Sequence, residues 1–208
     1  MYDYIFLDLD GTILEGKYKH YKCYTDTVNI LEGIPLDINI YWEMKRKRVS
    51  LDKILEYSDL RGDKETFLKI WKQRIEKAEY LMLDYLKPNI EVTLSRLKKD
   101  TKKLWLVTNR FEESSLDRQL EKFGIKHNFD KIICTKSSEV DSKFQILSKL
   151  EYNKAILIGD TEADRRTAEM LNIAFVGISN GLRTPDVFNG TDSYEELYLV
   201  KLGGGLDE

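Results

Sequence analysis

Five short apolar segments, with helical stretches between the last four, constrain the fold of this 208-residue chain most strongly. The apolar segments are residues 4–9, 103–108, 131–135, 155–159 and 173–178. The stretches of helical period are residues 113–125, 142–150 and 162–173. Strands that alternate with helices predict a parallel sheet covered on both faces, and near-continuous apolar strands fit that burial. We therefore expect an α/β fold with a doubly wound, Rossmann-like parallel sheet.

Residues 15–85 break this alternation, because they contain no convincing strand. Apolar residues recur there at helical spacing, first Val49, Leu51, Ile54 and Leu55, then Phe67, Leu68, Trp71, Ile75 and Ala78. A structureless loop of this length is implausible in a compact domain. We expect a small α-helical cap domain over residues 15–85, with residues 1–14 and 86–208 forming the core.

Composition and charge exclude several classes of protein. The net charge of −3 gives no electrostatic basis for binding nucleic acid or an anionic membrane, and no apolar run is long enough to span a bilayer. Asp3, Asp8 and Asp10 stand where a signal peptide would carry basic and apolar regions. Cys23 and Cys134 are too few for a disulfide framework and fit reduced thiols. We expect a cytoplasmic protein that is a monomer or a weak homodimer.

Polar residues gather where several predicted strands end. They are Asp8, Asp10, Thr108, Asn109, Asp160 and Asp164, with Lys143 at the start of the helix after the third strand. Ligands of an open parallel sheet bind beyond the carboxyl ends of its strands. Carboxylate oxygens suit Mg²⁺, which binds through one or two carboxylates together with substrate phosphate. Such a cation would also offset the repulsion among the acids.

These residues resemble the four signature motifs of the haloacid dehalogenase-like superfamily of phosphohydrolases. "DLDGT" at 8–12, "VTN" at 107–109, Lys143 and "GDTEAD" at 159–164 stand in the order of that family and at its strand ends. The resemblance covers residues 1–14 and 86–200. The helical interval at 15–85 falls where this family inserts its first type of cap.

The resemblance implies roles for the acids. Asp8 would be the nucleophile that forms an aspartyl-phosphate, a known use of carboxylates. Asp10 would be the general acid that protonates the leaving alkoxide, and then the base that activates water. Mg²⁺ would be held by Asp8, by the backbone carbonyl of Asp10 and by Asp160. Asp164 would act on the metal through water or by orienting its neighbours.

The resemblance also implies a site for the phosphoryl group. Thr108, the backbone N–H of Asn109 and Lys143 would surround the phosphoryl oxygens, where negative charge develops. Lys136 is the substitute for Lys143 if the third motif is placed differently. Many relatives that resemble phosphoglycolate phosphatases carry Lys-Pro at this motif, whereas here Phe144 follows the lysine.

The predicted function is therefore that of a Mg²⁺-dependent phosphoric monoester hydrolase acting on a small-molecule phosphate ester. Asp10 favours phosphate chemistry, because a carbon–halogen bond breaks without protonation of the leaving group. One alternative is a phosphosugar mutase of the same superfamily, which passes the phosphoryl group to a second hydroxyl. Another, from a different class, is a receiver-like signalling phosphoacceptor, although receivers lack an insertion of this size.

The densest basic stretch is "KRKR" at 45–48, inside the predicted cap. Four consecutive helical residues spread around the axis, so at most one or two can face the active site. The run is either a solvated surface, or Arg48 or Lys45 binds an anionic group on the leaving portion of the substrate. If the run is only a surface, specificity would depend on aromatic residues, namely Tyr41, Trp42 and Trp71.

Overall fold

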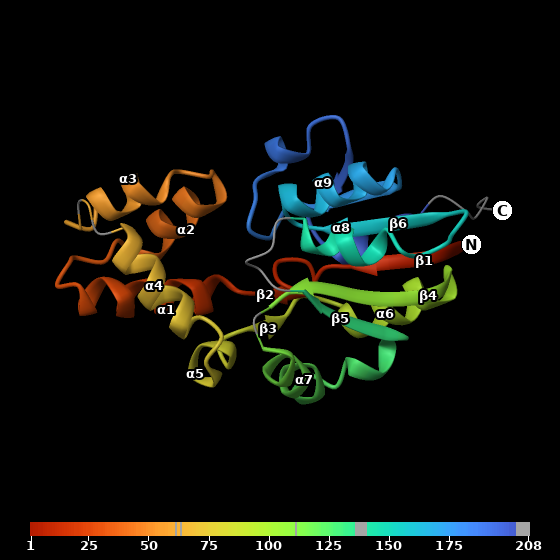
Figure 1. The fold of residues 1–208 in the computed structure, drawn as a ribbon, viewed down its shortest axis with the longest axis horizontal. Helices are drawn as coiled ribbons and strands as arrows, with labels where there is room; N and C mark the ends of the chain where they lie inside the picture. Colours follow the sequence, from red (N-terminus) through yellow and green to blue (C-terminus); the bar gives the residue numbers. More distant parts are fainter. Residues whose placement is uncertain (61, 63, 111, 136–140, 203–208) are drawn as a thin grey trace.

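A six-stranded parallel sheet forms the centre of the structure, a computed structural model that describes residues 1–60, 62, 64–110, 112–135 and 141–202 (Figure 1). The strand order is β5-β4-β1-β6-β7-β8, and each adjacent pair is parallel. The strands are β1 (Tyr2–Leu7), β4 (Thr101–Asn109), β5 (Lys131–Thr135), β6 (Ala155–Gly159), β7 (Ala174–Ile178) and β8 (Asp192–Tyr194). From the central strand β1, the chain adds β4 and β5 on one side of the sheet. It then crosses back and adds β6, β7 and β8 on the other side. The predicted doubly wound α/β sheet is thus confirmed.

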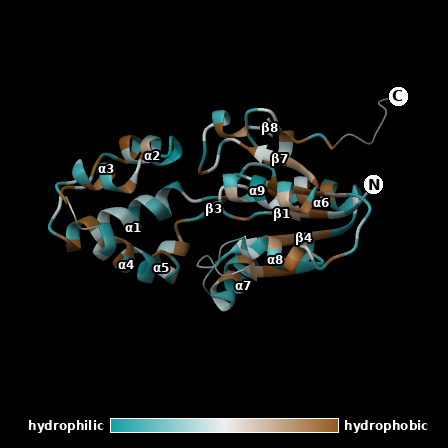
Figure 2. Cartoon of the chain, turned by 45° about the horizontal axis from the view of Figure 1, so that its top comes forward, coloured by the Kyte–Doolittle hydropathy of each residue, from teal (hydrophilic) through white to brown (hydrophobic). Residues whose placement is uncertain are grey.

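Alternate residues of β1 supply the cores of both sheet faces. Ile5 and Leu7 belong to the apolar cluster under α6 and α7, whereas Tyr4 and Phe6 belong to the cluster under α8 and α9. Figure 2 shows hydrophobic segments in both β1 and β4, although each strand also contains polar residues. The covering helices are α6 (Ile90–Lys99), α7 (Glu113–Lys122), α8 (Ser142–Leu147) and α9 (Glu162–Leu171). Short 3-10 helices follow at Lys126–Asn128, Pro185–Phe188 and Leu197–Leu199.

The helices of residues 15–85, hereafter the helical insertion, lie beyond the carboxyl ends of the strands, at the end of the molecule opposite the chain termini (Figure 1). They are α1 (Lys17–Ile30), α2 (Ile38–Arg46), α3 (Leu51–Glu56), α4 (Lys64–Arg74) and α5 (Ala78–Leu81). They pack around their own apolar cluster, which includes Tyr24, Tyr41 and Phe67. The division of the chain into a core and a cap domain remains a prediction.

A two-residue antiparallel ladder lies where the chain enters and leaves the helical insertion. Strand β2 (Leu14–Glu15) pairs with β3 (Tyr85–Leu86). Neither strand was expected from the sequence, because two residues are too short to show a period. Strand β8 was also missed, since its residues Asp-Ser-Tyr carry no apolar signal.

The first strand was predicted two residues too late. It ends at Leu7 because the chain turns directly afterwards, so Asp8 and Leu9 belong to the turn and not to the strand. Strand β4 is longer than expected and includes Asn109 as its last residue. Asn172 adopts the left-handed conformation expected of a residue that ends a helix.

The aromatic face of β1 generates a stability prediction. Phe6 has no exposed surface, and its ring packs against those of Tyr4, Trp105 and Tyr152. We expect Phe6→Ala to lower the free energy of unfolding by about 3–5 kcal/mol, because the cavity lies between close-packed layers. Val92→Ala, at a side chain that is 74% exposed, should change it by less than about 0.5 kcal/mol. Urea denaturation measures both; similar losses would contradict this account of the core.

Candidate active site

The chain turns sharply after β1. The carbonyl oxygen of Leu9 accepts hydrogen bonds from the backbone N–H groups of Ile13 and Leu14, both at 2.9 Å. Gly11 has a φ of +82°, in the left-handed region where a side chain is strained. A Cβ atom at this position would overlap the carboxylate of Asp160. The turn therefore packs directly against the acid at the end of β6.

Three buried acids meet one buried lysine at the carboxyl end of the sheet. Asp8 follows β1, Asp160 follows β6, and Asp164 lies in the first turn of α9. One carboxylate oxygen of each lies within 4.8 Å of the others. The Nζ atom of Lys143, near the start of α8, donates hydrogen bonds to Asp8 and Asp164 at 2.6 Å each. Four residues from separate strand and helix ends thus form one cluster, hereafter the acid cluster.

Among the described residues, the acid cluster is short of positive charge. Three carboxylates face one ammonium, which leaves a formal charge of −2 when all four are ionised. Burial raises the pKa of Asp8 to about 7, although the charge of Lys143 acts in the opposite direction. Burial and the charges of Asp8 and Asp164 raise the pKa of Asp160 well above its ordinary value. Burial disfavours the ammonium of Lys143, but the two carboxylates outweigh burial and raise its pKa.

The donor atoms of the cluster fit a hard divalent cation. Oδ2 of Asp160 accepts a hydrogen bond of 2.6 Å from the backbone N–H of Leu182. Its other oxygen, Oδ1, is buried and has no hydrogen-bond partner among the described residues. A buried, unsatisfied carboxylate oxygen is costly unless a ligand completes it. Oxygen ligands with this excess of negative charge are the kind that Mg²⁺ binds.

The side chain of Asp10 lies outside the acid cluster and is held by two cations. Arg110 donates from Nε and Nη2 to the two carboxylate oxygens, both at 2.8 Å, and Lys19 donates from Nζ at 2.7 Å. Burial acts to raise the pKa of Asp10, but the charges of Arg110 and Lys19 outweigh it and hold this pKa well below its ordinary value. Asp10 is therefore ionised at neutral pH in this arrangement.

The two cations belong to a buried network that joins the helical insertion to the core. Lys19 on α1 also donates to Asp84 at 2.7 Å, and Gln119 on α7 donates to the same carboxylate at 2.8 Å. Arg110 donates to Gln119 at 3.1 Å. None of these residues was predicted from the sequence. Arg110 directly follows the "VTN" motif, which is a usable signal, whereas nothing in the sequence distinguishes Lys19 from exposed lysines of the same helix.

Thr108 and Asn109 end β4, the strand next to β1. Thr108 is buried. The side-chain oxygen of Asn109 accepts hydrogen bonds from the hydroxyls of Thr135 and Ser142, the latter at 3.2 Å. These contacts fix the amide toward β5 and α8. Lys136, the substitute for Lys143, lies outside the described residues.

A cavity of about 240 Å³, hereafter the site cavity, lies where α1 and α4 face the strand ends. Asp10, Asn109 and Arg110 line its core side. His20 and Trp71 line the opposite side, with their rings stacked at a centroid distance of 5.9 Å. The cavity therefore offers a charged floor and an aromatic wall.

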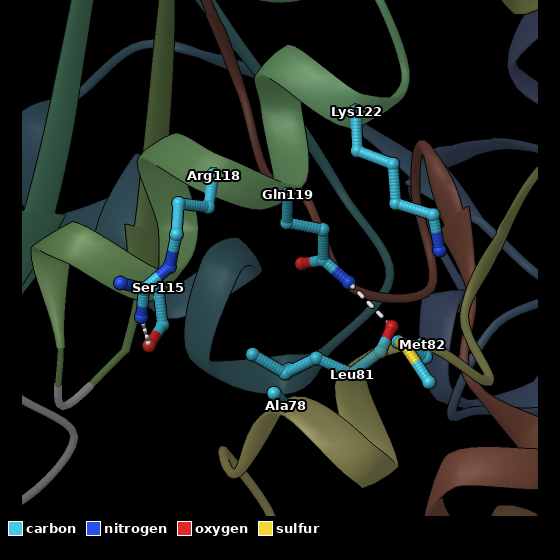
Figure 3. A pocket seen from close by; sticks show the side chains of 7 residues that line it. All are labelled: Ala78, Leu81, Met82, Ser115, Arg118, Gln119 and Lys122. Atoms are coloured by element: carbon cyan, nitrogen blue, oxygen red, sulfur yellow. Dashed lines mark hydrogen bonds between the residues drawn. The ribbon is translucent and has the colours of Figure 1, made fainter.

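A smaller pocket of about 170 Å³ lies between α5 and α7 (Figure 3). Gln119 spans it and donates a hydrogen bond of 3.0 Å to the carbonyl of Leu81. Its lining includes Ala78 and Met82 but none of the acids at the strand ends. Because the acids at the strand ends do not line this pocket, the candidate active site is the acid cluster with the site cavity.

The parallel sheet and the acids at its carboxyl edge have the arrangement that the sequence motifs predicted. The family model described as "Haloacid dehalogenase-like hydrolase" matches residues 4–178. The chain belongs to this family of phosphohydrolases, as the motifs predicted. This membership favours an enzyme over a receiver-like signalling protein.

Solved structures share the fold at low sequence identity. A haloacid dehalogenase-like family hydrolase from Streptococcus pneumoniae is 23% identical, with a TM-score of 0.73 and 92% of each chain covered. A predicted phosphatase from Clostridium acetobutylicum is 20% identical, with a TM-score of 0.72 and 93% of each chain covered. A predicted phosphoglycolate phosphatase from Haemophilus somnus is 19% identical, with a TM-score of 0.71 and 95% of each chain covered. These likenesses concern the fold.

Curated relatives and membrane-spanning helices are the two remaining sources of functional information. None of the curated proteins matches the sequence. Within the described residues, no helix combines the length and the apolar character needed to cross a membrane.

The contact between Gly11 and Asp160 generates a second prediction. Gly11→Ala combines a strained φ with an overlap onto Asp160, whereas Gly124→Ala has a similar φ of +67° and open space around the new Cβ. We expect Gly124→Ala to lower the free energy of unfolding by about 1–2 kcal/mol, the cost of the left-handed conformation. Gly11→Ala should cost a further ~1–3 kcal/mol, because the turn is overpacked. If denaturant unfolding shows the same loss of stability for both variants, the carboxylate of Asp160 moves aside without an energetic cost.

Proposed function

We propose that this protein is a Mg²⁺-dependent phosphatase that hydrolyses a small phosphate monoester through an aspartyl-phosphate. The observation that carries the proposal is the buried acid cluster of Asp8, Asp160 and Asp164 with Lys143 at the strand ends. Membership of the haloacid dehalogenase-like hydrolases supports it.

In the first step, a carboxylate oxygen of Asp8 forms a bond to phosphorus while the bond to the leaving oxygen breaks. Lys143, which contacts Asp8 at 2.6 Å, would neutralise charge on the phosphoryl oxygens, together with Thr108 and the backbone N–H of Asn109. The leaving oxygen takes its proton from Asp10. In the second step, Asp10 removes a proton from water, whose oxygen attacks phosphorus and releases Asp8.

Asp10 is better prepared for the second of these steps. A carboxylate held ionised by Arg110 and Lys19 is a base, and it must gain a proton before it can act as an acid. Because Lys19 belongs to α1, the state of Asp10 depends on the position of the helical insertion. We infer that the insertion acts as a cap over the site, which is supported by the lining of the site cavity by His20 and Trp71.

Asp8, Asp160 and the backbone carbonyl of Asp10 would hold Mg²⁺. The metal would supply positive charge that offsets the acid cluster and the incoming phosphate. Oδ2 of Asp164 accepts hydrogen bonds from the hydroxyl and backbone N–H of Thr161, at 2.6 and 3.2 Å, and Oδ1 accepts from Lys143. Asp164 is thus held in place, and it would orient Lys143 or reach the metal through water.

Asp8→Asn tests the nucleophile. The amide keeps the shape of the side chain but cannot attack phosphorus, so we expect turnover to fall by roughly three or more powers of ten. Asp3→Asn, near the start of the strand that precedes Asp8, is the control and should keep activity within about twofold of the parent. The measurement is release of inorganic phosphate from a panel of small phosphate esters. Activity of Asp8→Asn within tenfold of the parent would refute the assignment, and phosphoryl transfer without release of phosphate would identify a mutase.

The charge of the acid cluster predicts how Mg²⁺ and pH act on stability. Folding raises the pKa of Asp8 to about 7, so this group stabilises the metal-free protein below about pH 4 and loses that contribution as pH rises through 7. Mg²⁺ at 100 times its dissociation constant should stabilise by about 2.7 kcal/mol, or roughly 5–10 °C, at pH 8. The shift should be smaller at pH 5, where protons compete for Asp8.

Thermal unfolding with Mg²⁺ or with a chelator, at both pH values, measures this effect. Asp160→Asn removes one ligand and should abolish most of the shift. A shift of equal size at both pH values, or one that survives in Asp160→Asn, would place the metal elsewhere.

A further inference from the structure

The basic residues at 45–48 have different surroundings. Lys47 is exposed and pairs with Glu43 one turn earlier on α2, at 2.6 Å. Arg46 donates from Nη2 to the backbone carbonyls of Ser179 and Arg183, at 2.6 and 3.1 Å. The first is a solvated surface residue, and the second holds the helical insertion against the loop after β7.

Arg48 is exposed, and its Nε contacts Glu162 at 2.8 Å. Arg183 contacts the same carboxylate at 2.8 Å. One carboxylate therefore pairs with two guanidinium groups, which leaves one positive charge in excess among the described residues at this point.

Lys45 has no carboxylate partner among the described residues. Its Nζ lies 5.8 Å from the ring centroid of Trp71. Burial and the nearby charge of Arg183 lower the pKa of Lys45 to about 8. An anion bound beside Lys45 would stabilise the charged form of its ammonium group.

Lys45, Arg48 and Arg183 line one cavity of about 330 Å³, hereafter the cap cavity. The remaining wall is apolar and aromatic and includes Tyr41 and Phe67. Two positive charges in excess, together with aromatic walls, describe a pocket for an anionic group carried on an apolar or aromatic body.

The cap cavity adjoins the site cavity. Trp71 lines both, and His20, which lines the site cavity, stacks on Trp71. Leu182 also lines the site cavity, and the next residue along the chain, Arg183, lines the cap cavity. A molecule that enters the site cavity beside Asp10 and Asn109 can therefore extend past Trp71 toward Lys45.

We propose that the cap cavity binds a second, compact anionic group on the leaving portion of the substrate, with Lys45 as its main contact and Arg183 beside it. The inference rests on the proposed function and narrows the substrate to a phosphate ester that carries a carboxylate or a second phosphorus-containing anion beyond an apolar or aromatic body. Lys45 is the specificity-determining residue. Arg48 is bound to Glu162 and contributes less.

Three aryl phosphates test this inference: phenyl phosphate, 4-carboxyphenyl phosphate and 4-phosphonophenyl phosphate. They share one body and differ in the distal group, so they separate a carboxylate from a phosphorus-containing anion. We expect the parent to prefer one or both anionic substrates in kcat/KM. Lys45→Met should lower kcat/KM for the preferred anionic substrate by about tenfold or more, because a charged contact is lost. The loss for phenyl phosphate should be under threefold.

Two variants keep the test specific. Lys45→Arg preserves the charge and should retain most of the preference. Lys47→Ala removes an exposed cation directly after the end of the same helix and should leave all three values within twofold of the parent. Equal kcat/KM of the parent for all three substrates, or an equal loss for all three in Lys45→Met, would overturn the inference.

Binding to the Asp8→Asn variant separates this inference from the proposed function. Calorimetry should show that 4-carboxyphenyl or 4-phosphonophenyl phosphate binds at least tenfold more tightly than phenyl phosphate, and that adding Lys45→Met removes the difference. If the parent releases no phosphate but this preference is present, the proposed function fails and the anion site stands. If phosphate is released but the preference is absent, the anion site fails and the phosphatase stands.

Discussion

The contact of Asp8 and Asp164 with Lys143 is the interaction on which the site depends. A single buried ammonium holds two carboxylates from different elements at 2.6 Å, and Asp160 completes a group with too little positive charge. A pair of this kind is not retained for stability alone, since removing ions from water costs about as much as their attraction returns. In the proposed function, Mg²⁺ would supply the missing positive charge, and the acids would already be in place before the substrate binds.

The surroundings of Asp10 shift its pKa in the direction opposite to that of Asp8. Asp8 is buried with a raised pKa, whereas Asp10, two residues later, is held ionised by Arg110 and Lys19. Two carboxylates of one short motif are thus separated in their chemistry by their surroundings, the arrangement that acid–base division of labour requires. Because one of the two cations comes from α1, the helical insertion contributes to the charge environment of Asp10.

Sequence reasoning succeeded where topology alone brings residues together. Asp8 and Asp160 follow strands that are neighbours in the sheet, so their meeting follows from a parallel order of strands. It failed for Lys19, because the burial of this lysine depends on how α1 packs against the core. The sequence around Lys19 does not indicate that packing. It left Lys45 and Arg48 as equal candidates, because the choice depends on the rotation of α2. A usable signal was present: Lys45 lies four residues after the buried Tyr41, on the same helix face.

The pairing of β2 with β3 has a consequence for how such a chain can change. The chain leaves the core at Leu14–Glu15 and returns at Tyr85–Leu86, and these two segments lie side by side. The insertion therefore joins the sheet in the same way as the loop of a hairpin. Another set of helices could replace it without a change in the order of the strands. Such a replacement would remove Lys19 and Asp84. The new helices would then have to supply another cation that pairs with Asp10. A different helical insertion would therefore also change the charges that surround Asp10.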